Sequence, residues 1–168
     1  MMNKQELDLS ERFKELEKKL PKLNDGRLNY SKSKTCLVLT VFIKYKEKIL
    51  LLKRSGKVGT YKNKWNTVTG YIDENKPLYQ KIIEEINEEV GLKENDILSY
   101  KIFKPYEFMD KKINKKWIIY PSKIELKNNP KIILDWEHIE YKWIFPKDLT
   151  KFDTVPKLNL SLRKVIKE

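Results

Sequence analysis

The chain is poor in the residues that build disulfide frameworks, glycine-rich tails and membrane spans. Its 168 residues include one cysteine and five glycines. Cys36 cannot form an internal disulfide, which fits a reducing compartment, and the scarcity of glycine argues against an RGG-like RNA-binding segment. No apolar run approaches the roughly 18 residues of a membrane span, and residues 1–13 are charged throughout, unlike a signal peptide. We therefore expect a cytoplasmic protein with no membrane partner.

Positive charge and apolar side chains are abundant instead. Lysine and arginine number 36 against 24 acids, so the formal net charge is +12, and 40% of the residues are hydrophobic. This length and apolar content suffice for one domain with its own core. A basic protein attracts polyanions, either nucleic acid or phosphorylated small molecules. Because the basic residues are spread along the chain and mixed with acids, a generally basic surface explains them better than a dedicated nucleic-acid face.

The N-terminal residues form a segment of their own. Residues 4–20 carry apolar side chains at roughly helical spacing, which predicts an amphipathic helix. Pro21 and the cluster Asn24-Asp25-Gly26 end it. We interpret residues 1–30 as an N-terminal helical extension that docks on the main domain, residues 31–168, or on a second subunit, in which case the protein is a homodimer.

Strands and helices are both predicted in the main domain. In order, the sequence predicts a β-hairpin at 35–45 and 49–55, a short strand at 66–73, a helix at 77–90, longer strands near 99–108 and 117–126, a strand at 141–146, a short helix at 146–152 and a closing helix at 155–167. The fold class is therefore α/β, of the α+β kind, with a mixed β-sheet and helices packed on it.

The helix at 77–90 carries the clearest functional signal. Glu85, Glu88 and Glu89 fall at i, i+3 and i+4 and project from one face, beside an apolar stripe. Like charges at these spacings repel each other, and two of the glutamates lie in the last turn, where the helix dipole favours cations. A cation held between the carboxylates explains this arrangement, so we predict a divalent metal site.

The residues around these glutamates resemble the Nudix box, GX5EX7REUXEEXGU, in which U is aliphatic. The register matches without a gap at Gly70, Glu85, Ile86, Glu88, Glu89, Gly91 and Leu92. The resemblance covers about residues 34–165 and implies a mixed sheet sandwiched between helices. Two positions depart from the box, because Lys76 replaces its first glutamate and Glu84 its arginine. Since both changes reverse charge, we predict an ion pair between loop and helix with its signs exchanged. Asp73 or Glu74 is the alternative source of the missing carboxylate.

The resemblance implies hydrolysis of a pyrophosphate bond by metal-activated water. The cofactor is then Mg²⁺, which prefers oxygen ligands and keeps some of its waters, and Mn²⁺ can substitute for it. The implied metal ligands are Glu85, Glu88, Glu89 and the carbonyl of Gly70, and the same three glutamates are implied to be catalytic.

The resemblance indicates the general base less clearly than it indicates the metal ligands. In such enzymes it is a box glutamate, here Glu88, or an acid from a later loop, and both Glu137 and Glu140 are candidates. We include Glu140 in the catalytic set. His138 lies between charged residues, and we expect it to be exposed rather than catalytic.

The implied substrate is a nucleoside diphosphate linked to another moiety, such as a nucleotide sugar or a nucleoside triphosphate. An RNA end is a conceivable substrate because the surface is basic. Candidate contacts are, for phosphate, Arg54, Lys53, Lys57 and Lys64 and, for stacking on a base, Tyr61 and Trp65. Trp65 is equally expected in the core, and Trp117 and Trp143 are expected to be packing residues.

Two other classes of function remain open on the sequence. The charge reversals at Lys76 and Glu84 are compatible with a catalytically weak domain of the same fold that binds nucleotide or RNA. The third class is a structural or RNA-binding protein whose acidic helix is merely a solvated face.

Overall fold

Strand β1 (Thr35–Tyr45) runs through the middle of the eight-stranded sheet of the computed structural model, which describes residues 2–167. Most of its side chains are buried on both faces, as is typical of a strand between two layers. β1 pairs in parallel with β7 (Lys115–Leu126) and antiparallel with β4 (Val68–Tyr71). The predicted mixed sheet is therefore confirmed.

The predicted hairpin forms only around its turn. β2 (Lys48–Arg54) pairs with the end of β1, where Lys46 adopts a positive φ of 53°. β2 then diverges and pairs with β8 (His138–Ile144) and with the short β3 (Trp65–Asn66). Because β2 leaves the edge of β1, that edge is free to pair with β4.

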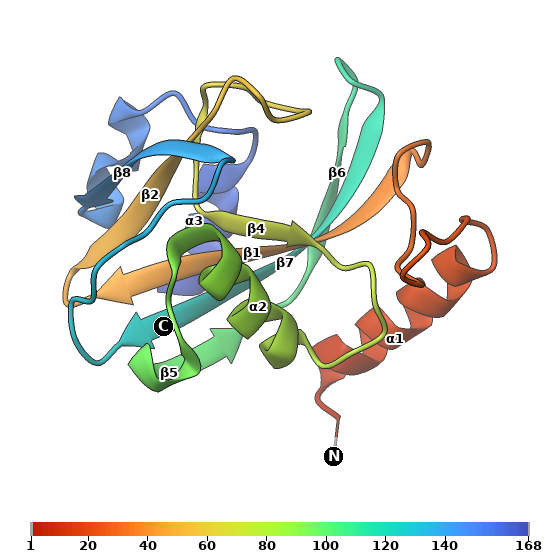
Figure 1. The fold of residues 1–168 in the computed structure, drawn as a ribbon, viewed down its shortest axis with the longest axis horizontal. Coiled ribbons are helices and arrows are strands. Elements are labelled where there is room, and N and C mark those ends of the chain that lie inside the picture. The colour runs from red at the N-terminus through yellow and green to blue at the C-terminus, as the bar shows by residue number, and fades with distance from the viewer. Residues whose placement is uncertain (1, 168) are drawn as a thin grey trace.

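The single strand predicted near 99–108 is two strands. β5 (Ile97–Ile102) and β6 (Tyr106–Asp110) pair antiparallel with successive parts of β7. Pro105 separates them, and a proline has no N–H to donate to a continuous ladder. The hairpin from β6 into β7 extends beyond the body of the sheet (Figure 1).

Helices α1 (Lys4–Glu17) and α2 (Leu78–Val90) pack on one side of the sheet (Figure 1). α1 is shorter than the predicted helix at 4–20, and it buries Leu9 and Phe13 in the core that α2 shares. The N-terminal extension thus docks on the sheet of its own chain. A short 3₁₀-helix, η1 (Glu94–Asp96), connects α2 to β5.

A second apolar cluster is formed with α3 (Leu158–Ile166) and the 3₁₀-helix η2 (Pro146–Lys151). Successive strand residues point to opposite faces, and Phe42 of β1 accordingly joins Leu162 and Val165 of α3 rather than the α2 cluster. A mixed sheet sandwiched between helices is confirmed. Within residues 2–167, no helix has the length and apolar character needed to cross a membrane.

Candidate active site

Helix α2 holds the acidic residues, and local signals define both of its ends. Pro77 occupies the N-cap position, where its missing N–H costs no helical hydrogen bond. Gly91 adopts a φ of 72° just past the last turn, a left-handed conformation that glycine enters without a steric penalty. The helix predicted at 77–90 is confirmed, which places its glutamates on the expected face.

A cavity of about 820 Å³ opens beside α2, a volume that suits a small-molecule ligand. Its wall includes Glu85, Glu88 and Glu89 from α2 and Gly70 from β4. The structure therefore brings all four predicted metal-binding residues to one cavity.

Gly70 and Glu85 approach each other so closely that a side chain at position 70 would displace the Glu85 carboxylate. A Cβ atom added to Gly70 would collide with the carboxylate of Glu85. The Glu85 side chain is only 9% exposed. Its burial raises the pKa of Glu85 to about 7, although the ammonium of Lys81, 2.9 Å from Oε1, opposes this shift by favouring the carboxylate.

Glu89 is the most deeply buried of the three glutamates, with its side chain 4% exposed. The backbone N–H of Thr69 donates to its Oε2 at 3.4 Å. Burial raises the pKa of Glu89 well above its usual range, and the neighbouring carboxylates, Glu85 first, add to the shift. No lysine or arginine within residues 2–167 forms an ion pair with Glu89, so this buried carboxylate lacks a compensating cation.

The donor set at this wall fits a hard divalent cation. In the part of the chain that the structure describes, no three His, Cys, Asp or Glu side chains converge tightly enough to hold an ion by themselves. The buried carboxylate of Glu89, which no ammonium or guanidinium in residues 2–167 compensates, the carboxylate of Glu85, which is paired with Lys81, and the backbone of Gly70 nevertheless offer the oxygen donors that Mg²⁺ prefers, and substrate and water would complete its shell. Glu88 is exposed at the cavity and can join them.

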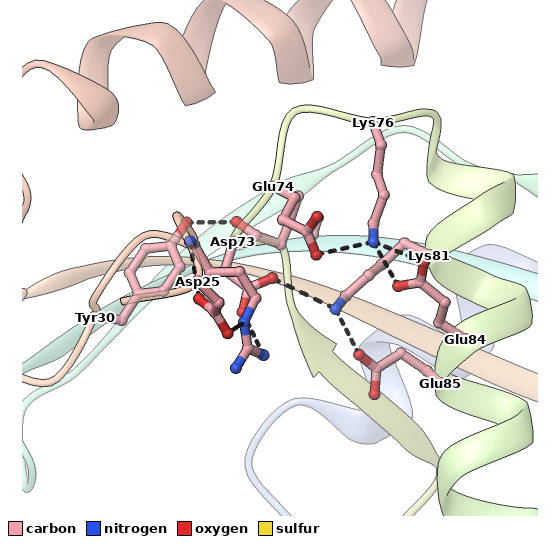
Figure 2. Close-up of polar contacts among 10 residues, drawn as sticks. Asp25, Tyr30, Asp73, Glu74, Lys76, Lys81, Glu84 and Glu85 are labelled. Carbon is pink, nitrogen blue, oxygen red and sulfur yellow. Dashed lines mark hydrogen bonds and ion pairs between the residues drawn. The ribbon is translucent and has the colours of Figure 1, made fainter. Parts of the chain in front are cut away.

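The predicted ion pair with exchanged signs is present. The Lys76 Nζ lies 2.7 Å and 2.6 Å from the two carboxylate oxygens of Glu84, and 2.9 Å from Glu74 Oε1 (Figure 2). Desolvation alone would lower the pKa of Lys76, but these hydrogen bonds outweigh it and raise the pKa. The contact ties the loop before α2 to the helix. An ion pair between these two positions is therefore present although Lys76 and Glu84 depart from the box. Glu74 and Asp73, the alternative carboxylates, are themselves paired with lysines.

Lys76→Glu should destabilise the protein, and a second change should repair it. The single variant places a carboxylate against Glu84 and Glu74, and we expect unfolding to become easier by about 1–2 kcal/mol, or a fall in Tm of roughly 3–6 °C. The double variant Lys76→Glu/Glu84→Arg restores opposite charges and should recover most of that loss. Thermal unfolding followed by circular dichroism measures both, and equal Tm values for the single and double variants would contradict a structural role for the pair.

Comparison with known protein families shows the family to which this chain belongs. A model of the NUDIX domain matches residues 36–168. The chain belongs to the Nudix family. It is accordingly a Nudix pyrophosphohydrolase, since hydrolysis of pyrophosphate bonds is the general activity of that domain. No curated protein matches the chain in sequence.

Solved structures share the Nudix fold at low sequence identity. The MutT protein of Methanosarcina mazei Go1 has a TM-score of 0.64 and 21% identity, covering 79% of this chain and 93% of its own. A C. elegans Ap4A hydrolase in a binary complex has a TM-score of 0.61 and 20% identity, covering 77% and 93%. The NUDIX domain of Shewanella oneidensis NrtR, complexed with ADP ribose, has a TM-score of 0.65 and 13% identity, covering 77% and 85%. These likenesses support the fold alone.

His138 is buried beneath the Nudix box, so the expectation that it is exposed was wrong. Its Nδ1 lies 2.9 Å from Asp135 Oδ1, and its Nε2 lies 3.9 Å from Glu89 Oε2 with no hydrogen-bond partner among the described residues. Burial lowers the pKa of His138, and the neighbouring Asp135 only partly offsets this. The sequence shows charged neighbours but does not show that pairing with Arg54 of β2 turns this residue inward.

The two candidate bases lie in different places. Glu137 lines the cavity and is half-buried, and its burial, together with Asp135, raises its pKa. Glu140 does not line the cavity; its side chain is 45% exposed and lies 3.5 Å from Lys142 Nζ. Glu137 precedes β8, whereas Glu140 lies within that strand, beside Lys53 of β2. The structure therefore brings Glu137, and not Glu140, to the box glutamates.

Arg54 and Tyr61 are the predicted substrate contacts that line the cavity. The Arg54 guanidinium is mostly buried and donates from Nε and Nη2 to the carbonyl of Thr60, at 3.1 Å and 2.9 Å. It therefore shapes the loop that carries Tyr61. The Tyr61 hydroxyl donates to Asp110 at 2.7 Å and accepts from Trp117 Nε1 at 3.0 Å, which fixes its ring at the cavity wall.

The other predicted contacts do not line the cavity. Lys64 Nζ is paired with Asp153 at 2.7 Å, and Lys53 Nζ lies 5.9 Å from the ring of Trp65. Trp65 itself is buried against Phe152, as its alternative interpretation expected. β3 directs it into the α3 cluster.

Sequence reasoning missed an aromatic wall of the cavity. Tyr71 stacks between Tyr30 and Trp117, at ring centroid distances of 5.2 Å and 6.3 Å. Tyr71 and Trp117 both line the cavity. Tyr71 directly follows Gly70 and could have been suspected for that reason, but Trp117 was expected only to pack. It comes from β7, whose nearness to the box depends on long-range pairing.

Proposed function

We propose that this Nudix pyrophosphohydrolase cleaves a nucleoside diphosphate linked to another moiety. The observation that carries the proposal is Glu89, a buried carboxylate at the wall of a ligand-sized cavity that has no ammonium or guanidinium partner among residues 2–167. Burying a lone carboxylate is costly unless a proton or a cation neutralises it. A divalent metal that arrives with an anionic substrate satisfies this requirement.

Mg²⁺ is the proposed metal, with Mn²⁺ as its substitute, and Glu85, Glu88, Glu89 and the Gly70 carbonyl are its proposed ligands. When bound, the metal would neutralise charge on phosphoryl oxygens and lower the pKa of its water. The chain contributes the positions of these oxygens, because Pro77 and Gly91 set the two ends of α2 and the Gly70 backbone lies against Glu85.

Glu137 is proposed as the group that accepts the proton of the attacking water. It reaches the cavity from the segment before β8, outside α2, so it need not be a metal ligand at the same time. Its raised pKa brings it closer to the value that suits a general base near neutral pH.

The aromatic wall supports a nucleoside as part of the substrate. Tyr71 is 42% exposed and lines the cavity beside Trp117, so this wall offers aromatic surface against which a base can pack. The fold is shared with an Ap4A hydrolase and with a NUDIX domain complexed with ADP ribose, both of which concern nucleotides with linked phosphates.

The proposal is tested with a panel of substrates and a chelator. ADP-ribose, Ap4A, a nucleotide sugar, nucleoside triphosphates and a triphosphorylated RNA oligonucleotide are incubated with the protein and Mg²⁺, and products are separated by chromatography. We expect at least one small nucleotide to yield two phosphorylated products and EDTA to stop the reaction. No turnover of any compound would favour the alternative, a Nudix-fold domain that only binds nucleotide or RNA. The Lys76–Glu84 pair supports hydrolysis over that alternative, because it keeps the loop tied to the helix despite the two departures from the box.

Metal should stabilise the protein, and more strongly as pH rises. Without metal, the folded-state pKa values of Glu85 and Glu89 are raised, so the stability they contribute is present at low pH and is lost as pH rises through those values. His138 has a lowered pKa, so the stability that it contributes is lost as pH falls below its usual pKa of about 6.5. The comparison is therefore made between pH of about 6.5 and 8. At a metal concentration of about 100 times Kd, the gain is about 2.7 kcal/mol, or roughly 5–10 °C in Tm.

Differential scanning fluorimetry with MgCl₂, MnCl₂ or EDTA at the two pH values measures this shift. Glu140→Gln, which replaces an exposed carboxylate outside the cavity, should show the wild-type shift in Tm. A shift that is independent of pH, or that persists in Glu89→Gln, would place the metal elsewhere.

A further inference from the structure

Lys81 is a charged residue in the cavity that the Nudix box does not prescribe, since it falls in the box's seven-residue spacer. It lies one helical turn before Glu85 on α2, so both side chains project from the same face. Its Nζ lies 2.9 Å from Glu85 Oε1 and 3.5 Å from Asp73 Oδ1, and its side chain is 9% exposed (Figure 2). An ammonium group therefore already occupies the space between two carboxylates at the cavity wall.

The chain of alternating charges continues into the N-terminal segment. Asp73 Oδ2 lies 3.5 Å from Arg27 Nη1, and Arg27 Nε donates to Asp25 at 2.8 Å. Asp73 is buried, so Lys81 is held from two sides. A buried ammonium with two carboxylate partners has a fixed position, because moving it would leave buried charges unpaired.

Glu85 and Glu89 thus differ in what compensates their charge. Glu85 has an ammonium at hydrogen-bond distance, whereas Glu89 has no such partner among residues 2–167. A divalent ion that shared Glu85 with Lys81 would be repelled by the ammonium. The oxygen Oε1 of Glu85 is therefore partly withheld from any metal, and Glu89 is not.

We infer that Lys81 is a built-in cation of this active site, which neutralises Glu85 and limits how many divalent ions the site binds and how tightly. This rests on the proposed function, because it assumes that the box glutamates bind metal. Lys81 is a positioning residue in this scheme: it acts on the metal through Glu85 and is not itself a ligand. The metal is then held chiefly through Glu89 and the remaining oxygen of Glu85.

Binding of Mn²⁺ in the absence of substrate tests the inference. Free Mn²⁺ is measured by electron paramagnetic resonance during titration of the folded full-length chain. Lys81→Met, which keeps the aliphatic stem and removes the charge, should lower the dissociation constant by about tenfold or more or add a bound ion per chain. Lys81→Arg keeps the charge and should bind as the wild type does. Lys93→Met removes one exposed lysine outside the cavity and should also leave Mn²⁺ binding unchanged, which controls for net charge.

Unchanged or weaker Mn²⁺ binding in Lys81→Met would overturn the inference. If circular dichroism shows that Lys81→Met does not fold, Lys81→Gln is titrated in the same way with the same expectation, and failure of both to fold would make Lys81 a structural residue and overturn it too. The proposed function fails separately: Mn²⁺ binding that is absent from the wild type, or that is unaffected by Glu89→Gln, removes the metal site itself. Binding that depends on Glu89 but not on Lys81 would leave the proposed function standing and remove only this inference.

Discussion

Glu89→Gln is expected to abolish hydrolysis while leaving the fold intact. The substitution keeps the shape of the side chain but removes the charge that would hold a divalent ion, and metal-ion charge stabilisation is worth several kcal/mol, so kcat should fall by about 10³-fold. The metal-free protein should become more stable, because a neutral amide is cheaper to bury than a carboxylate.

Steady-state kinetics, Mn²⁺ titration and thermal unfolding of the same preparations measure these three effects. Glu140→Gln is the matched control, since it makes the same chemical change on an exposed residue outside the cavity. Loss of activity together with loss of stability would indicate that Glu89 is structural. Retention of more than about a tenth of the wild-type kcat would contradict its role as a metal ligand.

Glu137→Gln should lower kcat by about 10²–10⁴-fold, the usual contribution of a general base. Mn²⁺ affinity should change little, because Glu137 is not among the proposed ligands. This combination separates Glu137 from Glu89, for which activity and metal binding should fall together. The rate of the remaining reaction should also lose the dependence on pH that Glu137 contributes.

The comparison with Glu140→Gln decides between the two candidate bases. The structure places Glu137 at the cavity and Glu140 on the exposed part of β8, so the second variant should keep wild-type kinetics. The opposite result would show that β8 shifts when substrate binds. Equal activity of both variants and the wild type would return the role of base to a box glutamate, with Glu88→Gln as the next measurement.

Features that depend on neighbouring residues were predictable from the sequence. Pro77 and Gly91 bound α2 through their own backbone preferences, and the spacing of the glutamates follows from the helical repeat. The Lys76–Glu84 ion pair was predictable because both residues belong to one loop-helix segment. The positions of the strands followed from apolar runs, apart from the break at Pro105 and the predicted strand at 66–73, which is divided between β3 and β4.

Features that depend on pairing between distant strands were not predictable in the same way. Glu137 and Glu140 are similar acids in one short segment, and only the pairing of β8 with β2 decides which one faces the cavity. The same pairing buries His138. Trp65 and Trp117 are both aromatic residues of strands, yet the first enters the core and the second lines the cavity.

By itself, the sequence determined that a helix with three glutamates, bounded by Pro77 and Gly91, follows a strand that contains Gly70, in the register of a Nudix box. It also determined the Lys76–Glu84 ion pair, whose signs are exchanged relative to the box. These are short-range properties, set by backbone preference and by spacing along one helix. The tertiary structure alone decided which residues from other elements surround that helix: His138 beneath Glu89, and Tyr71 with Trp117 across the cavity. Burial and strand pairing bring these groups together, and neither can be read from local sequence, since each depends on segments far apart in the chain.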